Sequence, residues 1–186
     1  SNHSGLEKIF NIEKVDGDVI EDREIEDNYF FKIVKDNSLY HEDPDCAEGW
    51  MPPRHNRYHV PKYEYKIDDE VPIPPSLKEA IMSFVLTSAC RNYRGYVEDG
   101  KSMLIHVSKF QDVQDIVYKQ VSDYMDVLRS RMQADHYLHD DTISRFEEIW
   151  HKNFYIHKDQ TEEKMPTWQD LLDHKYSLKF IINEVC

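Results

Sequence analysis

The sequence lacks the common signatures of nucleotide and hydrolase chemistry. It contains only five glycines in 186 residues, and neither the phosphate-loop pattern GxxxxGK nor the dinucleotide pattern GxGxxG occurs. The nucleophile elbow GxSxG and the zinc-binding pattern HExxH are missing as well. These absences exclude a phosphate loop, a dinucleotide fingerprint and two large hydrolase classes within these residues.

Cysteine and long apolar runs are also scarce. The three cysteines, Cys46, Cys90 and Cys186, are odd in number, widely spaced and without a CxxC pair. They suggest no disulfide framework and favour a reducing compartment, so we expect a cytoplasmic protein. No apolar run approaches the roughly 18 residues of a membrane helix, and no signal peptide is recognisable. We therefore expect no membrane partner.

Positive charge is in deficit. The 23 Lys and Arg residues face 36 Asp and Glu residues, which gives a net charge of -13. Binding to phosphates depends on positive charge and counterion release. The chain is therefore expected to bind nucleic acid poorly by itself, unless its basic residues cluster. The 12 tyrosines and eight phenylalanines indicate a folded core rather than disorder.

The N-terminal region, residues 1–75, is predicted to be an extended, proline-rich and β-hairpin extension. Short apolar runs flank a turn signal at Asp16-Gly17-Asp18, and the aromatic and β-branched run 29–34 indicates a further strand. Seven of the eight prolines lie between Pro44 and Pro75. Because proline lacks a backbone donor, this segment should wrap a core built elsewhere, with one short strand at 63–67.

The remainder, residues 76–186, is predicted to form an α/β core. Ser76 and Glu79 have the spacing of a capping box that opens a helix, and Gly95 can end it. Amphipathic patterns predict further helices over 111–132, from Asp141 or Thr142, and at Thr167. The apolar runs 103–107 and 178–182 are interpreted as buried strands. Two such strands with helices between them predict a parallel strand pair joined by a long, right-handed helical crossover.

A metal site is one candidate. His41, Cys46, His55 and His59 lie in one loop-rich stretch, and two of these histidines are four residues apart. The prolines around them argue against a helix, however, and the cysteine has no cysteine neighbour. We favour loop histidines over a metal centre.

Other candidate residues flank the 103–107 run. His106 and Ser108 would lie at the edge of a ligand cleft, although a buried histidine paired with the backbone is the simpler alternative. Arg91, Arg94 and Lys109 are the candidates for phosphate contacts, although the two arginines also suit the C-terminus of a helix. A carboxylate nuclease site is weakly supported, because no PD-then-ExK pattern accompanies Asp112, Asp115, Glu147 and Glu148.

Three stretches carry a family resemblance. They are 71–84, VPIPPSLKEAIMSF; 101–110, KSMLIHVSKF; and 4–10, SGLEKIF. Together they resemble the Z-one domain, to which an endonuclease role is assigned and which occurs in bacterial proteins beside a superfamily 2 helicase-like ATPase. Such proteins often accompany restriction or phage-defence systems.

The resemblance implies an internal fragment of such a protein. It implies a partial RecA-like second lobe, with 103–107 as its first core strand. The phosphate loop and the arginine-bearing motif would lie outside, so the fragment should hold no cofactor and be inactive alone. The parent would use ATP and Mg²⁺, with DNA and the remaining ATPase domains as partners. One alternative is a non-catalytic acidic scaffold that docks other domains, and another is a free-standing metal-dependent nuclease.

Overall fold

The computed structural model describes residues 34–40, 42–63, 71–133, 141–155, 164–173 and 177–184. The chain divides into two compact units, residues 1–35 and 36–186. The predicted hairpin near residue 17 lies outside the described residues, as does nearly all of the predicted strands 29–34 and 63–67. The second unit contains all the helices described below.

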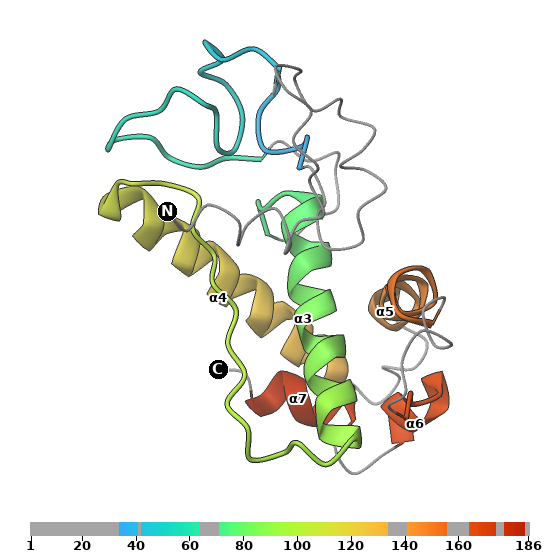
Figure 1. The fold of residues 1–186 in the computed structure, drawn as a ribbon. Helices are drawn as coiled ribbons and strands as arrows, with labels where there is room; N and C mark the ends of the chain where they lie inside the picture. Colours follow the sequence, from blue (N-terminus) through green and yellow to red (C-terminus); the bar gives the residue numbers. More distant parts are fainter. Residues whose placement is uncertain are drawn as a thin grey trace, which may run out of the picture. The chain divides into compact units, whose positions relative to one another are not determined.

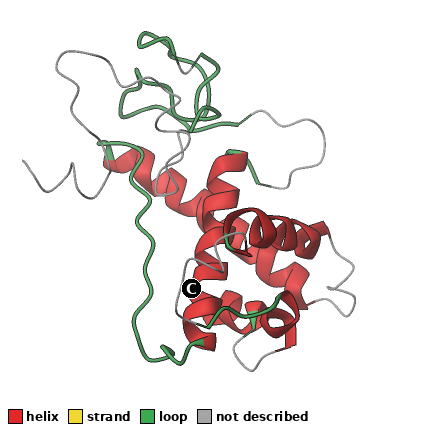
Figure 2. Ribbon diagram, turned by 45° about the vertical axis from the view of Figure 1, so that its right-hand side comes forward, coloured by secondary structure: helices red, strands yellow, loops and turns green. Residues whose placement is uncertain are grey.

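The described part of the second unit is helical, as Figures 1 and 2 show. Its helices are α3 (Pro75–Tyr93), α4 (Gln111–Gln133), α5 (Asp141–Asn153), α6 (Trp168–Asp173) and α7 (Leu178–Glu184). α3 packs against α5 and α7, while α4 and α6 also contact α7. Among the described residues, no helix is long and apolar enough to cross a membrane.

The predicted α/β fold is wrong. No β-strand occurs in the described ranges, so they contain neither the parallel strand pair nor a RecA-like lobe. The run 178–182 is part of helix α7, which buries Leu178, Ile181 and Ile182. That spacing of i, i+3 and i+4 covers one helical face, and a five-residue apolar run does not by itself distinguish this face from a strand. Residues 103–107 are extended but belong to no sheet.

The core of the second unit surrounds α3. Its side chains Ile81, Met82, Val85, Leu86 and Ala89 are all buried. Phe146 and Trp150 of α5 reach the same cluster and are fully buried. Complete burial of such an apolar side chain contributes about 1.5–3 kcal/mol to folding. α3 is therefore the scaffold against which the other segments are positioned.

The start of α3 differs from what the sequence predicted, whereas its end agrees with the prediction. The capping box is wrong, because Ser76 bonds to the distant Asp36 instead. The Ser76 amide donates to Asp36 Oδ2 at 2.8 Å, and the Ser76 hydroxyl donates to Oδ1 at 2.5 Å. Gly95 ends the helix as predicted, with a φ of 96°. The amides of Gly95 and Tyr96 donate to Asn92 and Arg91, the two bonds of a Schellman motif.

Candidate functional site

Residues 101–110 form an extended connector between α3 and α4, here called the strap (Figures 1 and 2). The solvent exposure of its side chains alternates from residue to residue over 101–107. Met103, Ile105 and Val107 pack against the core, whereas the Leu104 side chain is 89% exposed. A period of two places alternate side chains on opposite faces, as in a β-strand. The strap thus has a β-like conformation with one apolar face turned to the core.

The backbone of the strap is unpaired along its middle. Among the described residues, 102–107 take part in no backbone–backbone hydrogen bond. Most strands instead satisfy these donors and acceptors in a ladder with a neighbour. An extended segment that presents free N–H and C=O groups is an open edge, ready to pair with another strand.

Side chains fix the strap at both ends. At its start, Lys101 Nζ donates to the carbonyls of Tyr96 and Val97, both at 3.3 Å, and of Asp99 at 3.2 Å. At its end, Ser108 Oγ lies 2.9 Å from His55 Nε2 and accepts a hydrogen bond from the Phe110 amide at 3.1 Å. These contacts hold the extended conformation without a partner strand.

The His55 contacts define its tautomer. His55 Nδ1 lies 2.9 Å from the carbonyl oxygen of Pro52, which can only accept, so Nδ1 carries the proton. Nε2 then accepts from the Ser108 hydroxyl. A hydroxyl bonded to a histidine base is also the geometry of an activated nucleophile. Here, however, Ser108 is only 4% exposed and its oxygen receives the Phe110 amide, so the pair acts as a structural link.

The segment that carries His55, residues 42–63, is itself pinned to α4. Gln120 joins them, because Trp50 Nε1 donates to its Oε1 at 2.9 Å and its Nε2 donates to the Pro61 carbonyl at 2.8 Å. Arg57 adds an exposed ion pair with Asp112 at 2.9 Å. Buried side-chain hydrogen bonds between distant residues therefore replace regular secondary structure in this region.

Comparison with known families identifies the helical region. The family model of the Z1 domain matches residues 76–183. This chain belongs to the Z1 domain family. The family predicted from KSMLIHVSKF and its companion stretches is thereby confirmed. The matched region begins in the first turn of α3, contains the whole strap and ends in α7. No curated protein and no solved structure matches the chain.

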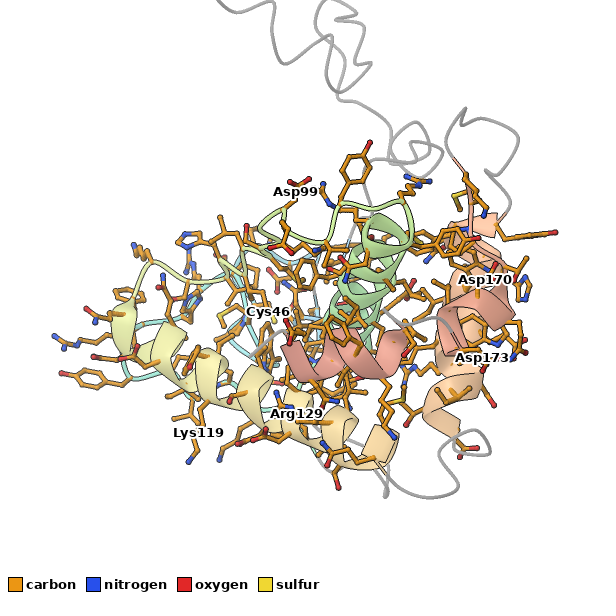
Figure 3. The ribbon with its side chains drawn as sticks, turned by 90° about the horizontal axis from the view of Figure 1, so that it is seen from below. Cys46, Asp99, Lys119, Arg129, Asp170 and Asp173 are labelled. Carbon is orange, nitrogen blue, oxygen red and sulfur yellow. The ribbon has the colours of Figure 1, made fainter. Side chains whose placement is uncertain are left out.

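The predicted metal candidates of the Z1 chain serve other purposes. Cys46, labelled in Figure 3, is buried and donates its thiol to the Glu48 carbonyl at 3.4 Å. His59 Nε2 lies 2.9 Å from the Trp50 carbonyl, and His55 makes the contacts above. Their rings lie 5.6 Å apart. In the part of the chain that the structure describes, no three His, Cys, Asp or Glu residues gather as metal ligands. His41 lies outside that part.

The three residues predicted to contact phosphates do not contact one another in the described part of the chain. Arg91 forms an ion pair with Asp99 at 3.2 Å, and Arg94 Nε donates to the Lys164 carbonyl at 3.1 Å. Lys109 lies over the Phe110 ring at 5.2 Å. A role of these three residues in DNA binding stays a prediction.

The predicted cleft-edge residues differ from each other. His106 is exposed, and its Nδ1 lies 3.5 Å from Gln114 Nε2, so the alternative of a buried histidine paired with the backbone is wrong. A cleft-edge role for His106 stays a prediction. Ser108 is buried and holds the strap. Sequence reasoning named both Ser108 and His55 but assigned them to separate sites. Their contact spans 53 residues, and no spacing pattern could have indicated it.

The acids weighed for a nuclease site are separate as well. Asp112 pairs with Arg57, and Glu147 lies 3.9 Å from His151 in the next turn of α5. Cys90 is a further potential reactive group, but burial raises the pKa of its thiol to about 12. A thiol with such a pKa stays protonated near neutral pH and is a poor nucleophile.

Asp170 at the start of α6 (labelled in Figure 3) is a carboxylate whose pKa is shifted by its surroundings. The Thr167 amide and hydroxyl each donate to its Oδ2 at 2.8 Å. These bonds favour the charged carboxylate and lower the pKa of Asp170. Lys164 lies 4.9 Å from the centre of the Tyr93 ring, and the Tyr93 hydroxyl raises the pKa of this lysine. This cluster links α3 to α6 and has the character of a helix cap.

Proposed function

We propose that this Z1 domain is a non-catalytic docking module of a nucleic-acid-dependent ATPase or endonuclease in bacterial restriction or phage defence. The domain would bind the helicase-like ATPase, on the same chain or on a partner. The class of parent protein follows from the family resemblance, and DNA, ATP and Mg²⁺ would be engaged through that parent.

The observation that carries the non-catalytic role is the use of Ser108 and His55. They are the one serine–histidine pair in the described contacts, and both side chains hold the strap in place. A nucleophile must reach its substrate, and a hydroxyl that is 4% exposed does not. The large apolar side chains that remain exposed suit binding to a protein instead. The most exposed of them are Leu39, Tyr40, Tyr58, Leu104 and Tyr118.

The acidic composition supports a protein partner over a direct nucleic-acid partner. The net charge is -13, and Arg54, Arg57 and Arg91 each pair with an aspartate of the domain. A phosphate would have to displace these carboxylates before it could use the arginines. A basic surface on the ATPase would meet no such obstacle.

The test uses the purified chain and a purified superfamily 2 ATPase encoded with it. Alone, the chain should neither hydrolyse ATP nor cleave single- or double-stranded DNA with Mg²⁺ or Mn²⁺. Mixed with the ATPase, it should form a stable complex and change the DNA-stimulated rate of ATP hydrolysis. Turnover by the isolated chain would refute the non-catalytic role. Failure to form the complex at micromolar concentrations would refute docking, and binding without an effect on turnover would indicate a passive scaffold.

A charge-reversal variant separates docking from direct DNA contact. If Arg91, Arg94 and Lys109 contact phosphates in the complex, Arg91→Glu with Arg94→Glu should weaken DNA binding and flatten its salt dependence. The matched control is Arg129→Glu on α4, labelled in Figure 3, whose own partner is the nearby Asp126. Unchanged affinity and salt slope would show that the two arginines only support the end of α3.

A further inference from the structure

The strap resembles a β-strand without a neighbouring strand. Its side chains alternate between the core and solvent, and its ends are fixed by Lys101 and Ser108. Its central backbone groups, at 102–107, have no backbone partner among the described residues. Only another extended backbone offers donors and acceptors at the matching spacing.

We infer that the strap accepts an extended segment of another polypeptide as a paired β-strand, with apolar and basic residues alternating along that segment. This inference rests on the proposed docking function and names the chemistry of the partner. Pairing of a peptide with an exposed edge draws affinity from main-chain hydrogen bonds and specificity from alternate side chains. Leu104 supplies the exposed apolar contact.

The charges near the strap favour a basic partner. Glu98 precedes the strap and Asp115 follows it, and both are exposed. The two lysines of the strap lie at its ends, where Lys101 donates to three carbonyls and Lys109 lies over the Phe110 ring. With a net charge of -13, a second copy of this chain is a less complementary occupant than a basic segment.

One edge of the strap is more open than the other. In an extended segment, the backbone groups of residues i and i+2 point to the same side. Gln114 Nε2 donates to the Ser108 carbonyl, so the first turn of α4 occupies the edge shared by the even-numbered residues at the end of the strap. The edge formed by residues 103, 105 and 107 is therefore the one assigned to the partner.

The experiment uses the full chain and an acetylated, amidated hexapeptide that alternates lysine with isoleucine. Amide hydrogen exchange is followed by NMR with and without the peptide. Exchange should slow at the amides of 103, 105 and 107 and stay unchanged at 102, 104 and 106. Uniform protection, protection of the even-numbered amides or no protection would each overturn the inference. Protection that grows with chain concentration in the absence of peptide would assign the edge to a second copy and overturn it too.

Two N-methylated peptides provide the matched control. They have the same charge and side chains, but one is methylated at alternate amides, which leaves one edge able to pair, and the other is methylated at every amide, which leaves no backbone N–H on either edge. Affinity should differ between them by about tenfold or more, the effect of losing one or more backbone hydrogen bonds. Equal affinities would show purely electrostatic attraction and would refute strand pairing.

Variants of the strap add an independent check. Ile105→Pro removes an amide of the assigned edge, whereas Ile105→Ala loses a similar apolar contact and retains the amide. The proline variant should lose peptide binding and the alanine variant should retain it, with folding of both verified by circular dichroism. Equal binding of the two variants would contradict the edge assignment. If the chain formed a complex with the ATPase but did not bind the peptide, strand pairing would be refuted and the docking function would stand.

Discussion

The helical core and the pinned segments of this domain are held by different forces. In the core, α3, α5 and α7 pack through apolar side chains such as Phe146 and Trp150. The pinned segments, here meaning 42–63 and the strap, contain no helix or strand. Some of their apolar side chains, such as Met103 and Trp50, also contact the core. What fixes their position is a small number of side-chain hydrogen bonds between distant residues, including Trp50 to Gln120 and His55 to Ser108.

This difference predicts two kinds of response to mutation. Apolar packing is distributed over many contacts, so damage to the core lowers global stability. A pinned segment relies on a few polar partners, so losing one should open that segment locally while the helices stay folded. The four predictions below test this contrast, in order of decreasing effect.

The largest effect is expected for Phe146→Ala in the core. Phe146 is fully buried, so its truncation should lower the free energy of unfolding by about 3–5 kcal/mol through lost burial and a residual cavity. Urea denaturation followed by far-UV circular dichroism measures this change. Tyr118→Ala, at an exposed position of α4, is the control and should stay within about 0.5 kcal/mol. Similar losses in the two variants would contradict the assignment of the core.

A smaller and more local effect is expected for Gln120→Ala. The change leaves the Trp50 indole N–H and the Pro61 carbonyl without their partner. Because local opening lets water reach both groups, the total cost is expected to be about 1–3 kcal/mol. Amide exchange should accelerate across 42–63 while the amides of α3 stay protected. Gln120→Glu keeps the acceptor for Trp50 and should show a partial effect. Faster exchange throughout α3 would mean that the segment and the core unfold together.

Ser108→Ala should loosen the end of the strap. It removes the bond to His55 and the acceptor for the Phe110 amide, with an expected cost of about 1 kcal/mol. Exchange at the Phe110 amide should accelerate, and the ring resonances of His55 should shift. Ser108→Thr retains a hydroxyl and serves as the control. If the alanine variant left both signals unchanged, the serine would not be the anchor.

The smallest effect concerns acid stability at α6. Because hydrogen bonds from Thr167 lower the pKa of Asp170 in the folded state, its stabilising contribution is present above the unfolded value, 3.8, and is lost as the pH falls through the lower folded pKa. Asp170→Asn should therefore reduce the Tm slightly at pH 6, with the difference vanishing in strong acid. Asp173→Asn, also labelled in Figure 3, is the control. A difference that grew on acidification would contradict the assigned direction.

The long helices could be predicted from the sequence, but their contacts could not. The periodic pattern predicted 111–132, and α4 spans Gln111–Gln133. Gly95 was identified as the stop of α3 because few other residues adopt a positive φ easily. The sequence predicted a helix opening at Ser76, and α3 begins one residue earlier, at Pro75, yet the acceptor for the Ser76 amide is Asp36. A local pattern cannot reveal an acceptor 40 residues away.

The strap and α7 show where periodicity fails. Each contains a five-residue apolar run, 103–107 in the strap and 178–182 in α7, and both runs were predicted as strands. The first became an extended segment without a sheet, and the second became a short helix that buries Leu178, Ile181 and Ile182. Neighbouring elements decided the outcome in each case. The His55–Ser108 link was likewise set by the tertiary fold, because its residues lie in separate segments.

The strap also restricts how this sequence can change in length. It spans the path between the loop that follows α3 and the first turn of α4 (Figure 1). The side chains of residues 101–107 alternate between its two faces. Inserting or deleting a single residue would exchange the faces, bringing Leu104 inward and its apolar neighbours out. A change of two residues would preserve the faces but displace one of the two end anchors. The length of the strap is therefore more tightly constrained than the identity of the residues between its two anchors.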